Sequence, residues 1–262
     1  MQPTPLARIV CPIDKTPLAR HEKSYRCEKG HTFDSAREGY TNLLSVQWKG
    51  SKNPGDDKLM TEARGRFLRQ GHYEPLMKAI AACVEAELKG QDEAALIDAG
   101  CGEGSYLRYL AKASEAWGPG TLFLSGYDIS KPAVISAAKE KGPIAYFVAG
   151  HRHPPYEEAS VSGILSVFAF PDWNAFAALL KPGGFVLTAE AGPDHLRELR
   201  EVLYEQVRES RPPPVETQTA AGISCAQSSS CKFELPLEGA AIADLFKMTP
   251  HYYRVTEEAK AR

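Results

Sequence analysis

The sequence has no apolar run that approaches the roughly 20 residues needed to cross a bilayer, which argues against a membrane-spanning helix. Its start, Met1 to Val10, also lacks an apolar stretch long enough for a signal peptide. Cysteine is sparse, with six residues in 262, and its spacing does not suggest a dense disulfide framework. We therefore expect a cytoplasmic protein with reduced thiols and no membrane partner.

Aliphatic residues are scarce between Cys11 and Asn42, where turn-forming residues predominate. This segment cannot build much of a core alone, so a metal ion or a neighbouring domain should hold it together. The chain as a whole does not lack core material, because 43% hydrophobic and 24% charged residues are ordinary values for a globular enzyme. Its 262 residues suffice for one large domain and one small one.

The net charge of −2 hides an asymmetry along the chain. Residues 1–70 hold 13 Lys and Arg against 8 Asp and Glu, which gives +5. The remainder holds 18 against 25, which gives −7. A basic segment on an acidic body suggests a polyanionic partner, although small polar domains are also often basic by chance.

Strand and helix patterns alternate through most of the chain, which predicts βαβ units and a parallel, doubly wound α/β sheet. The expected strands are Ala94–Ala99, Thr121–Tyr127, Ala145–Ala149, Gly163–Phe170, Phe185–Glu190 and a further one over Lys232–Leu237. The expected helices are Lys58–Arg69, capped by Asp56 or Asp57, then Tyr73–Lys89, Tyr106–Ala113, Pro132–Lys141, Asn174–Leu180, Asp194–Glu209 and Ala240–Phe246.

A glycine-rich string follows the first of these strands and opens a helix: Asp98-Ala-Gly100-Cys-Gly102-Glu-Gly104. Glycines at such a turn let a ligand approach the backbone and the helix N-terminus. Asp98 could hold an amino group of the ligand, and Asp128, which ends the next strand, could accept both ribose hydroxyls. The loop has no basic residue, which disfavours a phosphorylated cofactor. These features resemble the class I (Rossmann-like) S-adenosylmethionine-dependent methyltransferases; the alternative is a structural glycine turn beside a solvated carboxylate.

Four residues near the N-terminus have the outline of a zinc site built from two knuckles: Cys11, Asp14, Cys27 and His31. Asp14 is the unusual member, because a cysteine is expected there. Three alternatives stay open: Asp14 is a ligand, another residue such as His21 takes its place, or no metal binds.

Several strings spread over the chain are more specific together than any one alone. They are Cys11-Pro, Cys27-x-x-x-His31-x-Phe33-Asp34, Gly39-Tyr40-x-Asn42-Leu43-Leu44, Asn53-Pro54-Gly55-Asp56, Gly71-His72-Tyr73-x-Pro75-Leu76, Asp98 to Gly104, Gly192-Pro193-x-His195-Leu196 and Met248-Thr249-Pro250. From Cys11 to about Arg254 the chain resembles the 23S rRNA guanine-N1 methyltransferases. It looks close to the branch found in Gram-negative bacteria, and relatives in another branch give resistance to tylosin-type macrolides.

The resemblance implies three parts: a small zinc-ribbon-like, RNA-recognition module over residues 1–44, a linker and helix over 45–72, and a methyltransferase domain over 73–262. It places the zinc ligands on Cys11, Asp14, Cys27 and His31, with Asp14 the mismatch. It places contacts to S-adenosylmethionine on Tyr73, Gly102, Glu103 and His195. With the residues inferred from the glycine string, the expected cofactor set is Tyr73, Asp98, Gly100, Gly102, Glu103, Gly104, Asp128 and His195.

The implied reaction is methyl transfer to N1 of a guanine in a hairpin of 23S rRNA. N1 must lose a proton, and Asp172 and His151 are weak candidates for the acceptor, with His153 a further one. Phe168, Phe170 or Trp173 could stack on an unpaired guanine. The phosphates would be held by basic residues, namely Arg20, Lys23, Arg26, Lys29, Lys49 and Lys52.

The sequence departs from the family a second time at its C-terminal end, where relatives continue to a strand that inserts antiparallel into the sheet. Either the sheet exposes an edge here, or a partner chain covers it, for example in a homodimer. Two rival functions therefore remain. One is a methyltransferase acting on tRNA or on a small molecule; the other is a catalytically impaired relative that binds RNA without modifying it.

Overall fold

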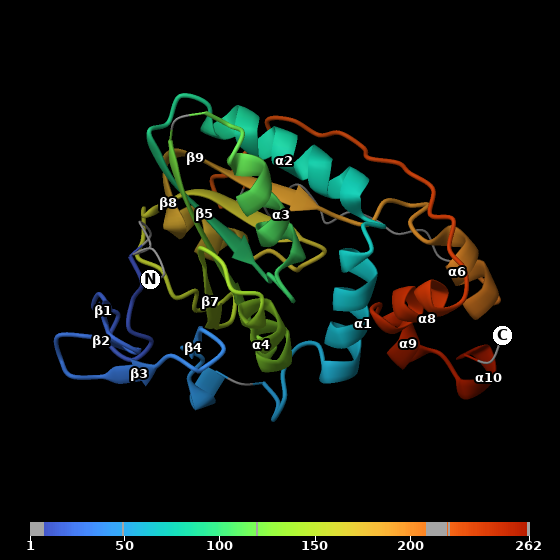
Figure 1. Cartoon of the computed structure of the whole chain (residues 1–262), viewed down its shortest axis with the longest axis horizontal. Coiled ribbons are helices and arrows are strands. Elements are labelled where there is room, and N and C mark those ends of the chain that lie inside the picture. The colour runs from blue at the N-terminus through green and yellow to red at the C-terminus, as the bar shows by residue number, and fades with distance from the viewer. Residues whose placement is uncertain (1–7, 49, 119, 208–218, 220, 261–262) are drawn as a thin grey trace.

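One six-stranded sheet organises the protein (Figure 1). The structure is a computed structural model, and it describes residues 8–48, 50–118, 120–207, 219 and 221–260. The strand order is β4-β7-β6-β5-β8-β9, and every pairing is parallel. The strands are β4 (Tyr40–Asn42), β5 (Glu93–Ala99), β6 (Thr121–Asp128), β7 (Ile144–Val148), β8 (Val161–Val167) and β9 (Leu180–Ala189). The predicted doubly wound α/β fold is confirmed.

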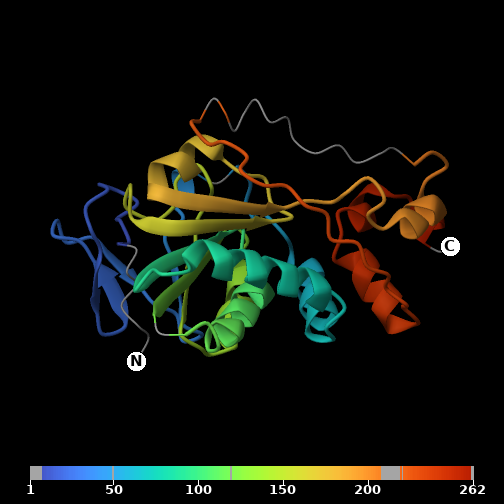
Figure 2. The same ribbon diagram turned by 90° about the horizontal axis from the view of Figure 1, so that it is seen from above.

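Helices cover both faces of the sheet, as Figure 2 shows for the teal and green helices on one side and the gold helix on the other. The helices are η1 (Val46–Trp48), α1 (Lys58–Arg69), α2 (Glu74–Leu88), α3 (Ser105–Ser114), α4 (Lys131–Lys139), α5 (Trp173–Leu179), α6 (Arg197–Leu203), α8 (Ala240–Lys247), α9 (His251–Arg254) and α10 (Glu257–Lys260). Successive strand residues point to opposite faces, so Leu96 packs with α2, α3 and α4, while Ile97 packs with α5. No helix in these described ranges is long and apolar enough to cross a membrane.

The N-terminal segment forms a small antiparallel sheet of β1 (Ala19–His21), β2 (Ser24–Arg26) and β3 (Thr32–Asp34). Its few buried residues share the core on the α5 side of the large sheet, where the Tyr25 ring meets the Phe147 ring edge-on at 5.8 Å. The neighbouring domain thus provides the hydrophobic core that the N-terminal segment is too poor in aliphatic residues to form alone. β4 follows directly and belongs to the large sheet, as the partner of β7.

Two predicted elements are wrong. In place of the helix expected over Asp194–Glu209 the structure has the shorter α6, because Leu196 adopts a left-handed backbone with φ 52° just before it. His195 therefore precedes the helix. Glu209 lies outside the described residues. The segment Lys232–Leu237 is not a strand. In the described sheet β9 is the terminal strand, and a groove separates its outer edge from this segment.

The α1 helix begins as predicted, because the Asp57 carboxylate accepts a hydrogen bond from the Met60 amide at 2.9 Å. The other carboxylate oxygen of Asp57 accepts a hydrogen bond from the Tyr253 hydroxyl at 2.6 Å. The cap therefore links the start of α1 to α9.

We expect Asp57→Ala to lower the free energy of unfolding by about 1 kcal/mol, because it removes an N-cap. Urea denaturation followed by circular dichroism measures this. Asp57→Asn keeps a capping oxygen and should lose less. Glu62→Ala, an exposed change on the same helix, is the background control. Equal losses for the Ala and Asn variants would contradict the capping role.

Candidate functional site

The glycine string forms a tight turn at the carboxyl edge of the sheet. The amides of Gly100 and Cys101 donate to the carbonyl of Tyr127 at 2.9 and 3.0 Å, which folds the turn onto the end of β6. Gly100 has φ +84°, and a Cβ there would lie 2.9 Å from the Cβ of Ala169. Chain connections diverge from β5 toward β6 and later return to β8, so this is the switch point at which open α/β sheets bind ligands.

Asp98, the last but one residue of β5, is a buried carboxyl group without a partner. Its side chain is 1% exposed, and neither oxygen has a hydrogen bond within the described part of the chain. Burial, reinforced by the charge of Asp128, raises its pKa to about 8. A buried acid of this kind is costly unless a donor meets it, which suits the ammonium group of a ligand.

Asp128 joins the glycine turn to the next loop. Its carboxylate accepts hydrogen bonds from the amides of Gly102 at 2.9 Å and Ser130 at 2.8 Å. Burial raises its pKa, and these two bonds oppose that rise. Each oxygen keeps a further lone pair for a ligand hydroxyl, as expected from the sequence.

Glu103 lies in the same turn, but its carboxylate is already engaged. It forms an ion pair with Arg108 at 2.7 Å and accepts from the Ser105 amide at 3.1 Å. The Glu103 carbonyl also accepts from Arg108 Nη1 at 2.6 Å, so the predicted contact of Glu103 with a cofactor would involve its backbone amide.

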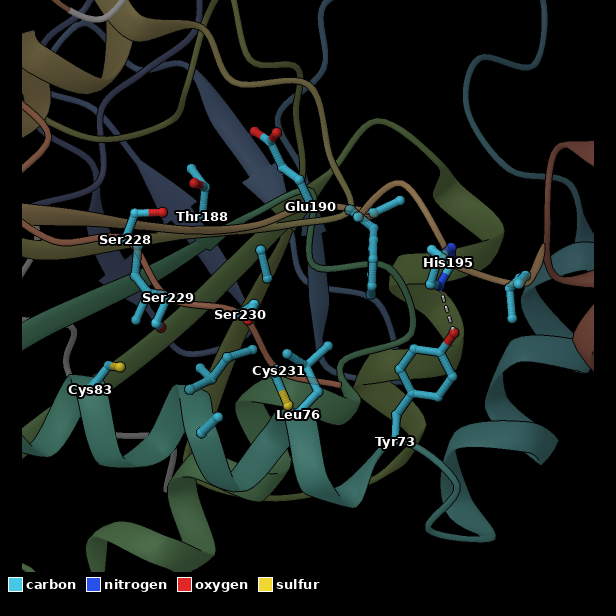
Figure 3. A pocket seen from close by; sticks show the side chains of 18 of the residues that line it. Tyr73, Leu76, Cys83, Thr188, Glu190, His195, Ser228, Ser229, Ser230 and Cys231 are labelled. Carbon is cyan, nitrogen blue, oxygen red and sulfur yellow. Dashed lines mark hydrogen bonds between the residues drawn. The ribbon is translucent and has the colours of Figure 1, made fainter. Parts of the chain in front are cut away.

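Tyr73 and His195 meet beside this turn, as the sequence resemblance implies (Figure 3). The Tyr73 hydroxyl lies 3.0 Å from Nε2 of His195, and the Phe168 ring stacks on the imidazole with a centroid distance of 5.5 Å. Burial raises the pKa of Tyr73 to about 12 and lowers that of His195 to about 4, so both groups are neutral near pH 7. They form an uncharged aromatic wall.

A groove of about 2620 Å³ extends from Tyr73 and His195 along the outer edge of β9. It runs between β9, α2 and the segment 222–237, and Figure 3 shows Leu76, Cys83 and Cys231 on its walls. Sequence reasoning missed this groove, because it depends on where an unpaired segment crosses the molecule.

Taken together, the residues at the carboxyl edge fit S-adenosylmethionine. The turn has no room for side chains at Gly100 or at Gly104, where a Cβ would lie 2.6 Å from the Tyr146 hydroxyl. The partnerless Asp98 carboxyl suits the amino group of the methionine part, and the carboxylate at the end of β6 suits a ribose. The electrostatic environment of the Tyr106 hydroxyl includes Tyr73, Asp98 and Glu103, so the predicted residues do converge.

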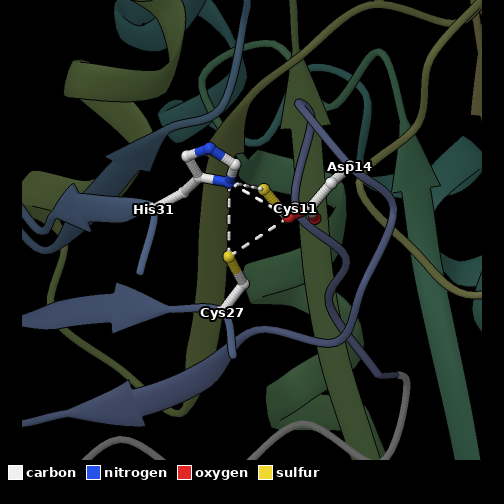
Figure 4. A group of neighbouring side chains, drawn as sticks. All are labelled: Cys11, Asp14, Cys27 and His31. Atoms are coloured by element: carbon white, nitrogen blue, oxygen red, sulfur yellow. Dashed lines mark hydrogen bonds and ion pairs between the residues drawn. The ribbon is translucent and has the colours of Figure 1, made fainter. Parts of the chain in front are cut away.

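The four predicted metal ligands also converge (Figure 4). Their ligand atoms all lie within 4.8 Å of one another. His31 Nδ1 lies 3.6 Å from the Cys11 sulfur, 3.4 Å from the Cys27 sulfur and 3.1 Å from Asp14 Oδ2. Ligand atoms around a tetrahedral zinc ion stand roughly 3.3–3.8 Å apart, given the usual zinc–ligand bond lengths. The donor set and its spacing therefore fit zinc.

Asp14 points into this cluster because a neighbour holds its other oxygen. The amide and hydroxyl of Thr16 both donate to Oδ1, at 3.1 and 2.7 Å, and these bonds lower the pKa of the carboxyl group. Oδ2 is left facing Cys27 and His31. Among the described residues His21 is not part of the cluster, so Asp14 rather than His21 occupies the fourth position.

The candidate proton acceptors differ in their surroundings. His151 places ring atoms 3.5 Å from the Cβ position of Gly100, and its Nδ1 lies 3.3 Å from the Tyr127 hydroxyl. Burial lowers its pKa, which keeps the imidazole neutral. Asp172 instead caps α5, accepting from the Ala175 amide at 3.1 Å. His153 stacks on Trp48 with a centroid distance of 4.0 Å.

The three aromatic candidates are not equivalent either. Phe170 is 91% exposed and Phe168 44% exposed, both just after β8 at the carboxyl edge. Trp173 is only 9% exposed and packs against Phe176, which leaves little of its ring for stacking on a base. The described basic candidates all lie on the surface, namely Arg20, Lys23, Arg26, Lys29 and Lys52, whereas Lys49 lies outside the described residues.

Comparison with known families gives two matches along the chain. Residues 9–52 match a zinc-ribbon model described as "RlmA, N-terminal", and residues 97–188 match a model described as "Methyltransferase domain". The first covers the metal cluster and the second begins one residue before Asp98.

Similar curated proteins align over most of the chain. A Streptomyces fradiae protein named 23S rRNA (guanine(748)-N(1))-methyltransferase is 31% identical over 96% of this chain and 88% of its own length. Two others carry the name 23S rRNA (guanine-N(1)-)-methyltransferase provisionally. One, from Bacillus subtilis (strain 168), is 32% identical over 92% of this chain and 85% of its own; the other, from Micromonospora griseorubida, is 32% identical over 76% and 70%. The chain thus belongs to the 23S rRNA (guanine-N1)-methyltransferase family.

Proposed function

We propose that this protein transfers a methyl group from S-adenosylmethionine to N1 of a guanine in a hairpin of 23S rRNA, in the cytoplasm. The observation that carries the proposal is the similarity over nearly the whole chain to relatives that are named for this reaction. The site adds support, since a glycine turn suited to the cofactor and a basic N-terminal segment with a metal-ligand cluster belong to one structure. We assign the module to residues 1–44, the linker and first helix to 45–72 and the methyltransferase domain to 73–262.

When bound, the cofactor supplies a methyl group on a sulfonium, which leaves the protein mainly the task of positioning the guanine. Guanine N1 carries a proton at neutral pH and must lose it before or during transfer. We propose His151 as the acceptor in preference to Asp172. Its imidazole is neutral and lies against the glycine turn, whereas the Asp172 carboxylate is engaged as a helix cap.

N1 lies on the pairing edge of guanine, so the base must be unpaired or flipped out of its stack. We propose that Phe170 and Phe168 receive it, because both rings are exposed at the carboxyl edge of the sheet. The exposed Arg and Lys side chains of the N-terminal module would bind the hairpin phosphates.

The decisive test uses protein-free 23S rRNA and methyl-labelled S-adenosylmethionine, followed by mapping of reverse-transcription stops. A methyl on N1 blocks base pairing, so we expect one sharp stop in one hairpin. Asp128→Ala should abolish the stop by removing the carboxylate that holds the glycine turn. Methyl label found in tRNA but not in 23S rRNA would show that the substrate is tRNA. Retained cofactor binding with no label in any RNA would point to an impaired, RNA-binding relative.

Cofactor affinity should depend on pH through Asp98. In the free protein its pKa is raised to about 8, and a ligand ammonium beside it favours the ionised form, so binding releases a proton below that pH. We expect the Kd for S-adenosylmethionine to fall roughly tenfold per unit between pH 6 and 7.5. Neither His195 nor Tyr73 titrates in this range.

Calorimetric titration in buffers of different ionisation enthalpy measures both the Kd and the proton release. Asp98→Asn keeps the shape of the side chain but removes its titration, so its Kd should be weaker and flat with pH. A wild-type Kd that does not change with pH would contradict the assigned role of Asp98.

Zinc should bind with one ion per chain, and its affinity should depend on residue 14. A thiolate is a softer ligand than a carboxylate and suits zinc better, so Asp14→Cys should bind more tightly than the wild type. Asp14→Ala should bind more weakly. Competition with a chromophoric chelator ranks the three proteins, and Asp34→Ala, an exposed carboxylate change outside the cluster, is the control. Purified wild-type protein without stoichiometric zinc would refute the site.

A further inference from the structure

We propose that Arg64 forms a carboxylate-binding site for the methionine part of S-adenosylmethionine. The inference rests on the proposed cofactor site, but not on the identity of the RNA. Neither the motifs in the sequence nor the family resemblance singles out this residue.

Arg64 projects from α1 onto the glycine turn. Its Nη1 atom lies 3.7 Å from the position that a Cβ on Gly102 would occupy, so the guanidinium covers the middle of the turn. The side chain is 25% exposed, which leaves it accessible from the cleft while shielding it from bulk water. Its charge acts on Asp128 and on the Tyr106 hydroxyl, the group that also senses Asp98 and Tyr73. Arg64 therefore lies at the glycine turn, beside several of the expected cofactor residues.

Two contacts hold the guanidinium in place. Nη1 forms an ion pair with the Asp56 carboxylate, and Nη2 donates to the Met248 carbonyl at 3.0 Å. These bonds use two of the five N–H groups of an arginine. The other three have no hydrogen-bond partner among the residues that the structure describes. An arginine fork that is already oriented loses little conformational entropy when it binds a carboxylate.

The charges in the cavity indicate what this fork binds. Asp98 suits the ammonium group of the ligand, and Asp128 suits its ribose. Because both side chains are acidic, neither favours binding of the ligand's carboxylate. A ligand carboxylate enclosed here without a cation would pay a large desolvation penalty. Arg108, the other cation at the turn, already binds Glu103 and Ser105. Among the described residues, Arg64 therefore keeps three N–H groups for a ligand and Arg108 keeps two.

The test compares two ligands that differ only in the carboxylate: S-adenosylmethionine and its decarboxylated form. Calorimetric titration of Arg64→Gln should show affinity for S-adenosylmethionine reduced on the order of 10- to 100-fold, as expected for lost charge-assisted hydrogen bonds. Affinity for the decarboxylated ligand should stay within about twofold of the wild type. Arg69→Gln removes the same charge from an exposed position on the same helix and should leave both affinities unchanged.

Arg64→Lys provides a second variant that keeps the charge and removes the fork, and it should fall between Gln and the wild type for S-adenosylmethionine alone. Equal losses for both ligands in either variant would overturn the proposal, because they would show a structural role. Unchanged affinity for S-adenosylmethionine would overturn it as well. Ligand discrimination at residue 64 combined with no stop in 23S rRNA would support the carboxylate site while refuting the proposed RNA substrate.

Discussion

The hydrogen bond from the Gly102 amide to the Asp128 carboxylate connects the turn after β5 to the end of β6, and the proposed cofactor site depends on it. The contacts continue from there as a closed circuit. Asp128 also accepts from the Ser130 amide, the Ser130 hydroxyl donates to the Asp56 carbonyl, and the Asp56 side chain pairs with Arg64, which lies over Gly102 again. Two strand ends, the loop before α1 and α1 itself are thereby held around one small volume.

The free protein carries an electrostatic cost in this volume. Asp98 is buried beside the charge of Asp128 and has no donor among the described residues, so its pKa rises. Burial of an uncompensated acid reduces stability in the absence of a ligand. A cationic ligand of the kind proposed would relieve that cost by placing a donor beside the desolvated Asp98 carboxyl group. The neutral wall formed by Tyr73 and His195 adds no charge of its own to this balance.

Much of the fold was predictable, because its signals are local. The alternating patterns located all five of the longer strands, and the Asp57 cap located the start of α1. The glycine string predicted the tight turn between β5 and α3 for the same reason. What failed depended on tertiary context: the late start of α6 at the left-handed Leu196, and the unpaired course of residues 232–237. The proposed role of Arg64 could not be predicted from the sequence, because it depends on contacts with Asp56 and with Met248, which lies 184 residues further along the chain.

The position of β4 has a consequence for how this protein can be divided. The strand lies within residues 9–52, which match the zinc-ribbon model, yet it pairs with β7 at the edge of the large sheet, and Tyr25 and Phe147 share one core. The recognition segment and the sheet therefore form one cooperative folding unit. A truncation after residue 44 would strip the sheet of an edge strand and uncover the apolar face beneath the segment. Exchanging this segment for that of another methyltransferase would therefore replace an edge strand of the sheet and part of its core at the same time.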